Sequence, residues 1–91
     1  MSRYRFERMC GGEAVGAVPK EVMDYDLEAV KGLLRAAGWD VGEEDFMVEA
    51  SRDGLQVTVY RTGRVMVSPM RDVERGRDVI ESVYGTIEPA R

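Results

Sequence analysis

Histidine and asparagine are absent from this 91-residue sequence, and glutamine occurs once, as Gln56. Without histidine, the chain lacks the side chain that most often serves as a general base and as a metal ligand. The cations are mostly arginine, and depletion of thermolabile amides is a reported trend in thermophilic proteins. The composition therefore indicates a thermophilic source, archaeal or otherwise prokaryotic.

Cysteine and long apolar runs are also scarce. The single cysteine, Cys10, cannot form an internal disulfide, which fits a reducing compartment. No apolar run approaches the roughly 20 residues that span a bilayer. The N-terminus lacks the apolar core of a signal peptide. We therefore expect a cytoplasmic protein that makes no use of a membrane.

The chain is long enough for one domain, over residues 1–91, with a single core. Its net charge of −4 argues against general binding of polyanions, because such binding is largely phosphate neutralisation. The charge is unevenly distributed. Residues 40–49 carry acids and no cation, whereas arginines outnumber acids over residues 52–77. The protein can therefore carry a local basic patch although its net charge is negative.

The N-terminal half predicts a strand and a helix. Alternating residues indicate a strand over residues 3–9. Small residues follow, and we expect them to form a flexible connection over about residues 10–23. A helix then begins after Asp26, whose carboxylate is a good N-cap, and ends at Gly38.

A three-stranded meander is predicted after that helix. The dipeptide Asp53-Gly54 is a two-residue hairpin signal. The second loop must keep Val65 on the face of Val59, because opposite residues of an antiparallel pair share a face. A three-residue loop that ends in a left-handed Gly63 meets this requirement. The predicted pairs are Met47–Tyr60, Val48–Val59, Ala50–Val57, Val59–Val65 and Val57–Val67.

Asp72 then caps a second helix, in which Gly76 implies a close approach of the helix backbone to the sheet. The expected order is β-α-β-β-β-α, followed by a frayed tail over about residues 88–91. We therefore expect an α+β fold, with an antiparallel sheet of about four strands and both helices packed on one face.

The other face of this sheet is expected to stay open. Strand parity places on it a polar background with a few larger apolar groups: Met47, Glu49, Ser51, Gln56, Thr58, Tyr60, Arg64, Met66 and Ser68. Phe46 falls on the opposite, core-facing parity.

One motif of the C-terminal unit is shared with a known family. The run Gly63-Arg64-Val65-Met66-Val67-Ser68 is followed by the helix cap Asp72. This layout of turn, basic residue, apolar strand, cap and helix resembles half of a TATA-box-binding-protein domain. The chain also looks similar to small uncharacterised archaeal proteins that resemble a single half-repeat. The resemblance implies a half-saddle that binds nucleic acid, and two copies joined edge to edge would rebuild a whole saddle.

Six residues form the interaction surface that we predict: Met47, Thr58, Tyr60, Arg61, Arg64 and Met66. Aromatic, methionine and arginine side chains are the types enriched at protein interfaces. An ordinary amphipathic outer face is the alternative, since scattered exposed apolar groups are normal. The two hairpin arginines would contact phosphates or protect an exposed edge from aggregation.

An acidic loop over residues 40–45 is a candidate metal site. Its carboxylates, Asp40, Glu43, Glu44 and Asp45, are ligands of the type that Ca²⁺ prefers. The loop lacks the spacing of an EF-hand, so a solvated loop is the alternative. The run Gly11-Gly12…Gly16 lacks the Gly-Lys-Ser/Thr ending of a phosphate-binding loop, and Cys10 has no histidine to activate it.

No nucleophile is paired with a base in this sequence, so we expect neither an enzyme nor a cofactor. The expected function is a small cytoplasmic interaction module that acts through the open sheet face, with a protein partner or a second copy of itself. The alternatives are a nucleic-acid-binding half-saddle that uses the arginine-rich hairpin, and a weak calcium binder that uses the acidic loop.

Overall fold

The computed structural model describes residues 4–8, 13–21 and 23–87, which form six strands and two helices. In chain order these are β1 (Tyr4–Arg8), β2 (Val15–Pro19), α1 (Leu27–Ala36), β3 (Asp40–Val41), β4 (Met47–Arg52), β5 (Leu55–Tyr60), β6 (Val65–Ser68) and α2 (Val73–Ile87). The predictions made for Cys10, Gly11-Gly12 and the tail 88–91 lie outside the described residues.

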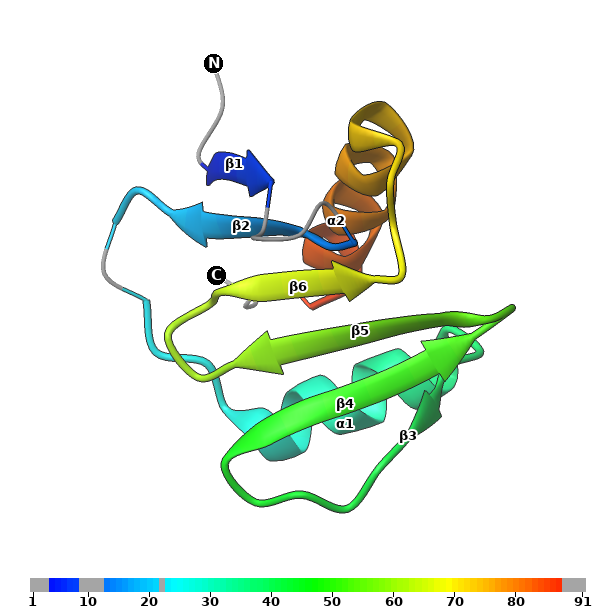
Figure 1. Cartoon of the computed structure of the whole chain (residues 1–91). Coiled ribbons are helices and arrows are strands. Elements are labelled where there is room, and N and C mark those ends of the chain that lie inside the picture. The colour runs from blue at the N-terminus through cyan, green and yellow to red at the C-terminus, as the bar shows by residue number, and fades with distance from the viewer. Residues whose placement is uncertain (1–3, 9–12, 22, 88–91) are drawn as a thin grey trace.

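The strands form one antiparallel sheet in the order β1-β2-β6-β5-β4-β3. Both helices lie behind this sheet in the view of Figure 1, with α1 against β3 and β4 and α2 against β2 and β6. The two helices also contact each other. The predicted α+β fold, with one antiparallel sheet and two helices on one face, is therefore confirmed.

The number of strands is where the prediction was wrong, because the sheet has six strands and not about four. Residues Val15–Pro19, predicted to lie in a flexible connection, form β2 and pair with both β1 and β6. Asp40 and Val41, from the acidic loop, form the short edge strand β3 against β4. The small residues of β2 give only a weak strand signal, and the segment becomes a strand because it pairs with neighbours that are distant in the sequence.

The predicted register of the meander is confirmed at every pair. Val48 lies opposite Val59 across the first turn, and Val59 lies opposite Val65 across the second. Gly63 has a φ of +94°, as the bulged loop requires. Its N–H donates to the carbonyl of Tyr60 at 2.8 Å, and the Tyr60 N–H donates to the carbonyl of Arg64 at 2.8 Å. One continuous apolar face results.

Both helices begin at the predicted caps. The Asp26 carboxylate accepts from the N–H of Glu28 at 3.0 Å, and the Asp72 carboxylate accepts from the N–H of Glu74 at 3.0 Å. The close approach expected at Gly76 is confirmed: a Cβ there would lie 3.0 Å from the Cβ of Val15. The α2 backbone therefore rests directly on β2.

Phe46 does not occupy the core, contrary to its predicted parity, and its side chain is 88% exposed. The strand β4 begins one residue later, at Met47, whose Cα partner is Tyr60. Since Phe46 precedes the ladder, no strand pairing imposes a side on it.

Among the described residues, no helix is long and apolar enough to cross a membrane.

The core lies between the sheet and the helices. Four fully buried valines from β5 and β6 share this core with Leu34 of α1 and Ile80 of α2. The valines are Val57, Val59, Val65 and Val67. Burying each such side chain contributes about 1.5–3 kcal/mol. Tyr84 of α2 lies in the same core, and its ring stacks on Tyr4 of β1 with centroids 3.8 Å apart and planes 5° from parallel.

The hydroxyl group of Tyr84 fastens α2 to the sheet. It donates to the carbonyl of Gly63 at 2.6 Å and lies 3.5 Å from the carbonyl of Ala17. Burial raises the pKa of Tyr84, because the phenolate would be poorly solvated, and Tyr25 and Tyr4 raise it further. The tyrosine is therefore held neutral.

We predict that Tyr84→Phe lowers the free energy of unfolding by about 1–3 kcal/mol at neutral pH, because the buried carbonyl of Gly63 loses its donor. The native pKa lies above the ordinary value of 10, so the parent chain keeps this contribution below pH 10. It loses the contribution as the pH rises above 10, where only the unfolded tyrosine ionises. Urea unfolding of both chains between pH 7 and 11 measures this. An equal alkaline decline in the two chains would contradict it.

We predict that Gly63→Ala destabilises the fold by roughly 2–4 kcal/mol, since the residue has positive φ and stands in a crowded place. A Cβ there would lie 2.7 Å from the Cγ of Pro19 and 2.9 Å from a ring carbon of Tyr25. Gly54→Ala is the matched control. Its φ is +82° and a Cβ there meets nothing within 4 Å, so we expect a loss of about 1 kcal/mol. Denaturation midpoints give both values, and equal losses would contradict the role of crowding.

Candidate binding face

The side of the sheet away from the helices is called the open face here, and Figure 1 looks onto it. The register arranges its residues in rows that run across the strands. A central row crosses five strands, because each of its members lies directly opposite the next: Glu49, Thr58, Met66, Gly16 and Glu7. Gly16, which has no side chain, is itself buried within this row.

The rows on either side of this central row differ in chemistry. One of them, the aromatic row, runs from Met47 to its Cα partner Tyr60 and on to Arg64, whose carbonyl accepts from the Tyr60 N–H. The other, the polar row, consists of Asp40, Ser51, Gln56 and Ser68. The open face is therefore apolar and basic at one end and polar at the other.

Five of the six residues of the predicted interaction surface lie together on the open face. Met47, Thr58, Tyr60, Arg64 and Met66 come from β4, β5, β6 and the residue before β6, and all five side chains are partly exposed. The alternation of side chains between the two faces of each strand was the sequence signal that predicted their position. The Nε atom of Arg64 is buried and has no hydrogen-bond partner among the described residues. This leaves a donor of the aromatic row unsatisfied.

The side chain of Arg61, the sixth residue, is directed toward Asp24, near the start of α1. Its Nε donates to the Asp24 carboxylate at 2.8 Å, and its carbonyl accepts from the Tyr25 N–H at 2.9 Å. The bond to Asp24 raises the pKa of Arg61, with smaller charge contributions from Asp24 and Asp26. The two side chains are 71% and 74% exposed, so the ion pair is worth little in stability. It nevertheless holds the guanidinium near the start of α1.

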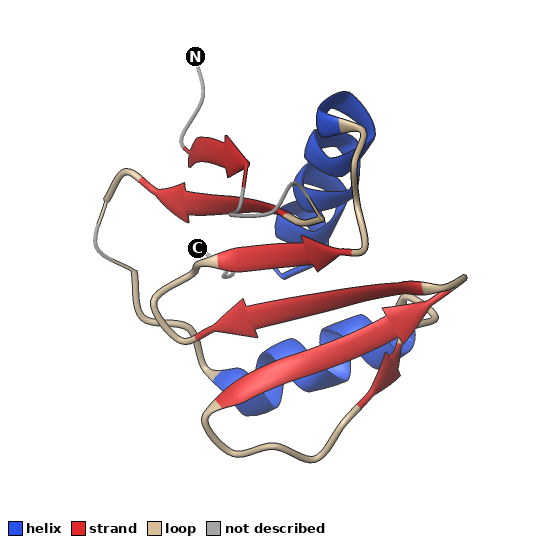
Figure 2. Ribbon diagram, in the orientation of Figure 1, coloured by secondary structure: helices blue, strands red, loops and turns tan. Residues whose placement is uncertain are grey.

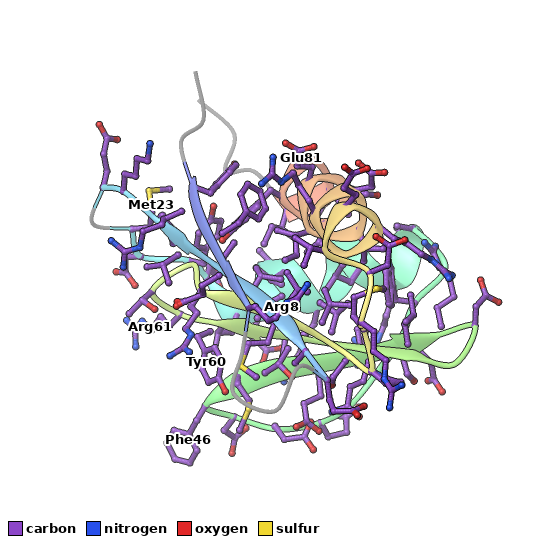
Figure 3. All side chains as sticks on the ribbon, turned by 45° about the horizontal axis from the view of Figure 1, so that its top comes forward. Arg8, Met23, Phe46, Tyr60, Arg61 and Glu81 are labelled. Carbon is purple, nitrogen blue, oxygen red and sulfur yellow. The ribbon has the colours of Figure 1, made fainter. Side chains whose placement is uncertain are left out.

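Phe46 is the functional candidate that sequence reasoning missed. Figure 3 shows its ring directed away from the body of the protein, at the same end of the sheet as Tyr60 and Arg61. Its neighbour Met47 begins the aromatic row, so Phe46 lies next to that row along the chain, just outside the ladder. The position of Phe46 at the very start of the predicted strand was the available signal, but alternation alone assigned it to the core.

The carboxylates of the acidic loop are not brought together at one site. Asp40 lies in β3, whereas the Glu43 carboxylate accepts from Arg35 at 3.3 Å on the helix side. Asp45 lines a depression of about 400 Å³ at the start of α1, together with Asp24 and Arg61. Over residues 4–8, 13–21 and 23–87, no group of three or more acidic, cysteine or histidine side chains is placed to share a metal ion. Calcium binding stays a prediction.

Similarity to a known protein covers most of the chain. Over 77 residues, 85% of its length, it is 26% identical to the "Sulfur carrier protein ThiS adenylyltransferase" of Bacillus subtilis (strain 168). The matched residues make up 23% of that enzyme, so the chain spans less than a quarter of its relative's length. No family model matches the chain, and no solved structure matches it.

Proposed function

We propose that this chain is a non-enzymatic module that binds a protein through the open face of its sheet. The observation that carries the proposal is the aromatic row with Phe46 beside it. Met47, Tyr60 and the partly buried Arg64 lie adjacent there, and Phe46, directly before Met47, is exposed at the same end of the sheet. Aromatic residues, methionine and arginine supply most hot spots and contact area in protein interfaces.

The named relative supports a protein as the partner. Its name describes adenylyl transfer to a carrier protein, and this chain corresponds to less than a quarter of its length. The sequence here contains neither histidine nor a Gly-Lys-Ser/Thr phosphate loop. We therefore propose that the shared region holds a protein substrate or partner and that adenylyl transfer belongs to the rest of the relative. A cytoplasmic location is part of this proposal.

A nucleic-acid-binding half-saddle is the second candidate, and one observation favours it. Phe46 is exposed at one end of the sheet, and an exposed apolar side chain of this kind could act as a wedge in a base step. Against it stand the net charge of −4 and the acids Glu7, Asp40 and Glu49 on the same face. Arg61 is also engaged by Asp24. We rank protein binding first for these reasons.

The sulfur carrier protein ThiS of Bacillus subtilis is the first partner to test. Titration into the isotope-labelled chain should move the amide signals of the central and aromatic rows, including those of Gly16, Thr58 and Tyr60. Shifts confined to α1 and α2 would contradict binding by the open face. A short DNA duplex at low salt is the parallel titration, and shifts on the open face with DNA alone would favour the half-saddle.

We predict that Phe46→Ala weakens binding of this partner about tenfold without destabilising the fold, since an exposed aromatic anchor contributes to binding and not to the core. Leu33→Ala is the matched control, because Leu33 is also an exposed apolar side chain (42%) but lies on α1. Calorimetric titration gives the two dissociation constants, and thermal unfolding verifies the folds. Equal affinities of the two variants would contradict the assignment of the binding face.

A further inference from the structure

The strand β1 ends the sheet on one side. It pairs with β2, and no other described strand lies on its outer side, as Figure 2 shows. Alternate residues of β1 therefore direct their backbone N–H and C=O groups away from β2, at this edge of the sheet. The opposite edge strand, β3, has only two residues and offers little to pair with. Any extension of the sheet by strand pairing is thus best made at β1.

The side chains of β1 alternate between the two faces of the sheet. Tyr4 and Phe6 are partly buried on the helix side, where they pack against the core. Arg5 and Glu7 lie on the open face, opposite Val18 and Gly16 of β2. Neither of these opposite residues is charged, so β2 supplies no ionic partner across the strand pair. On the open face, β1 thus carries one positive and one negative side chain, two residues apart.

Two-fold symmetry restricts how β1 can pair with a second copy of itself. An antiparallel pair with a two-fold axis places residue i opposite residue j and residue j opposite residue i. Opposite residues share a face, so i and j must both be even or both be odd. Around the middle of β1, three registers meet this condition: the axis passes through residue 5, 6 or 7.

Charge selects one of these three registers. An axis at residue 5 places Arg5 opposite the Arg5 of the second copy, and an axis at residue 7 places Glu7 opposite its own copy. Both arrangements bring like charges together, which is destabilising. An axis at Phe6 places Arg5 opposite Glu7 twice, once on each side of the axis. This register also pairs all five residues of the strand.

The helix side of the strand suits the same register. Phe6 meets its own copy at the axis, and aromatic pairs across strands are favourable. Tyr4 lies opposite the Arg8 of the second copy, where a cation can contact an aromatic ring. The stacking of Tyr4 on Tyr84 and the position of Arg77 over Phe6, 4.8 Å from the ring centroid, hold both rings in place before association. Little side-chain order then has to be gained on association.

We propose that the chain forms a two-fold symmetric dimer by antiparallel pairing of β1 with β1 of a second copy, with its axis at Phe6. The two sheets become one continuous sheet of twelve strands, twice the six of one chain. Their open faces join into one surface. A five-residue strand gives a small interface, so we expect a dissociation constant on the order of 10–100 µM. This contact does not use the aromatic row and is independent of the proposed partner.

Charge exchange tests the dimer and its register. In Arg5→Glu or in Glu7→Arg, each of the two ionic contacts becomes a like-charge contact, so we expect the dissociation constant to rise about tenfold or more. The double variant Arg5→Glu/Glu7→Arg restores opposite charges at both contacts and should dimerise like the parent. An equimolar mixture of the two single variants should form mixed dimers, because each variant supplies what the other lacks. Sedimentation equilibrium at 50 mM salt measures all four samples.

Matched controls are available at positions remote from β1. Glu44→Arg lies in the loop between β3 and β4, and Arg75→Glu lies on α2 beside Trp39 and Leu55. They make the same charge changes and should leave the dimer unchanged. A parent chain that stays monomeric at 1 mM overturns the proposal. So does dimerisation of the single variants with parental affinity, or a mixture of them that forms no mixed dimer. Circular dichroism of each variant confirms that the chain is folded.

Discussion

The buried hydroxyl group of Tyr84 is the contact on which the arrangement of sheet and helices depends. A donor removed from water must find an acceptor, and this one reaches the carbonyl of Gly63 in the β5–β6 loop and lies near that of Ala17 in β2. The ring meanwhile stacks on Tyr4 of β1. One side chain of α2 thus contacts the β5–β6 loop, β2 and the edge strand β1, and through them it helps to position the rows of the open face.

The meander was predictable because its constraints are local and redundant. Two turn signals, Asp53-Gly54 and Gly63, and the alternation of valines admit only one register that keeps every valine on one side. The same parity then sorts Tyr60 and Met66 onto the open face. Most of the candidate site therefore followed from the sequence, since a residue's side is settled once the register is known.

The features that were not predicted depend on contacts between distant parts of the chain. β2 consists of small residues without a strong strand signal, and it becomes a strand because β1, β6 and Gly76 of α2 surround it. Arg61 turns from the open face because Asp24, far away in the sequence, accepts its hydrogen bond. Phe46 lies just outside the ladder, where the alternation along a strand does not determine the direction of a side chain. Alternation within one segment carries no information about any of these contacts.

The place of β2 between β1 and β6 has a consequence for how the chain folds. The pairs β4–β5 and β5–β6 close across short turns, whereas β2 meets β6 only after the long intervening chain is brought back. Closing that long loop costs more entropy and slows folding. The meander is therefore expected to assemble first and the N-terminal hairpin to dock last. Until it docks, β6 presents an unpaired apolar edge, which makes this intermediate the state most prone to aggregation.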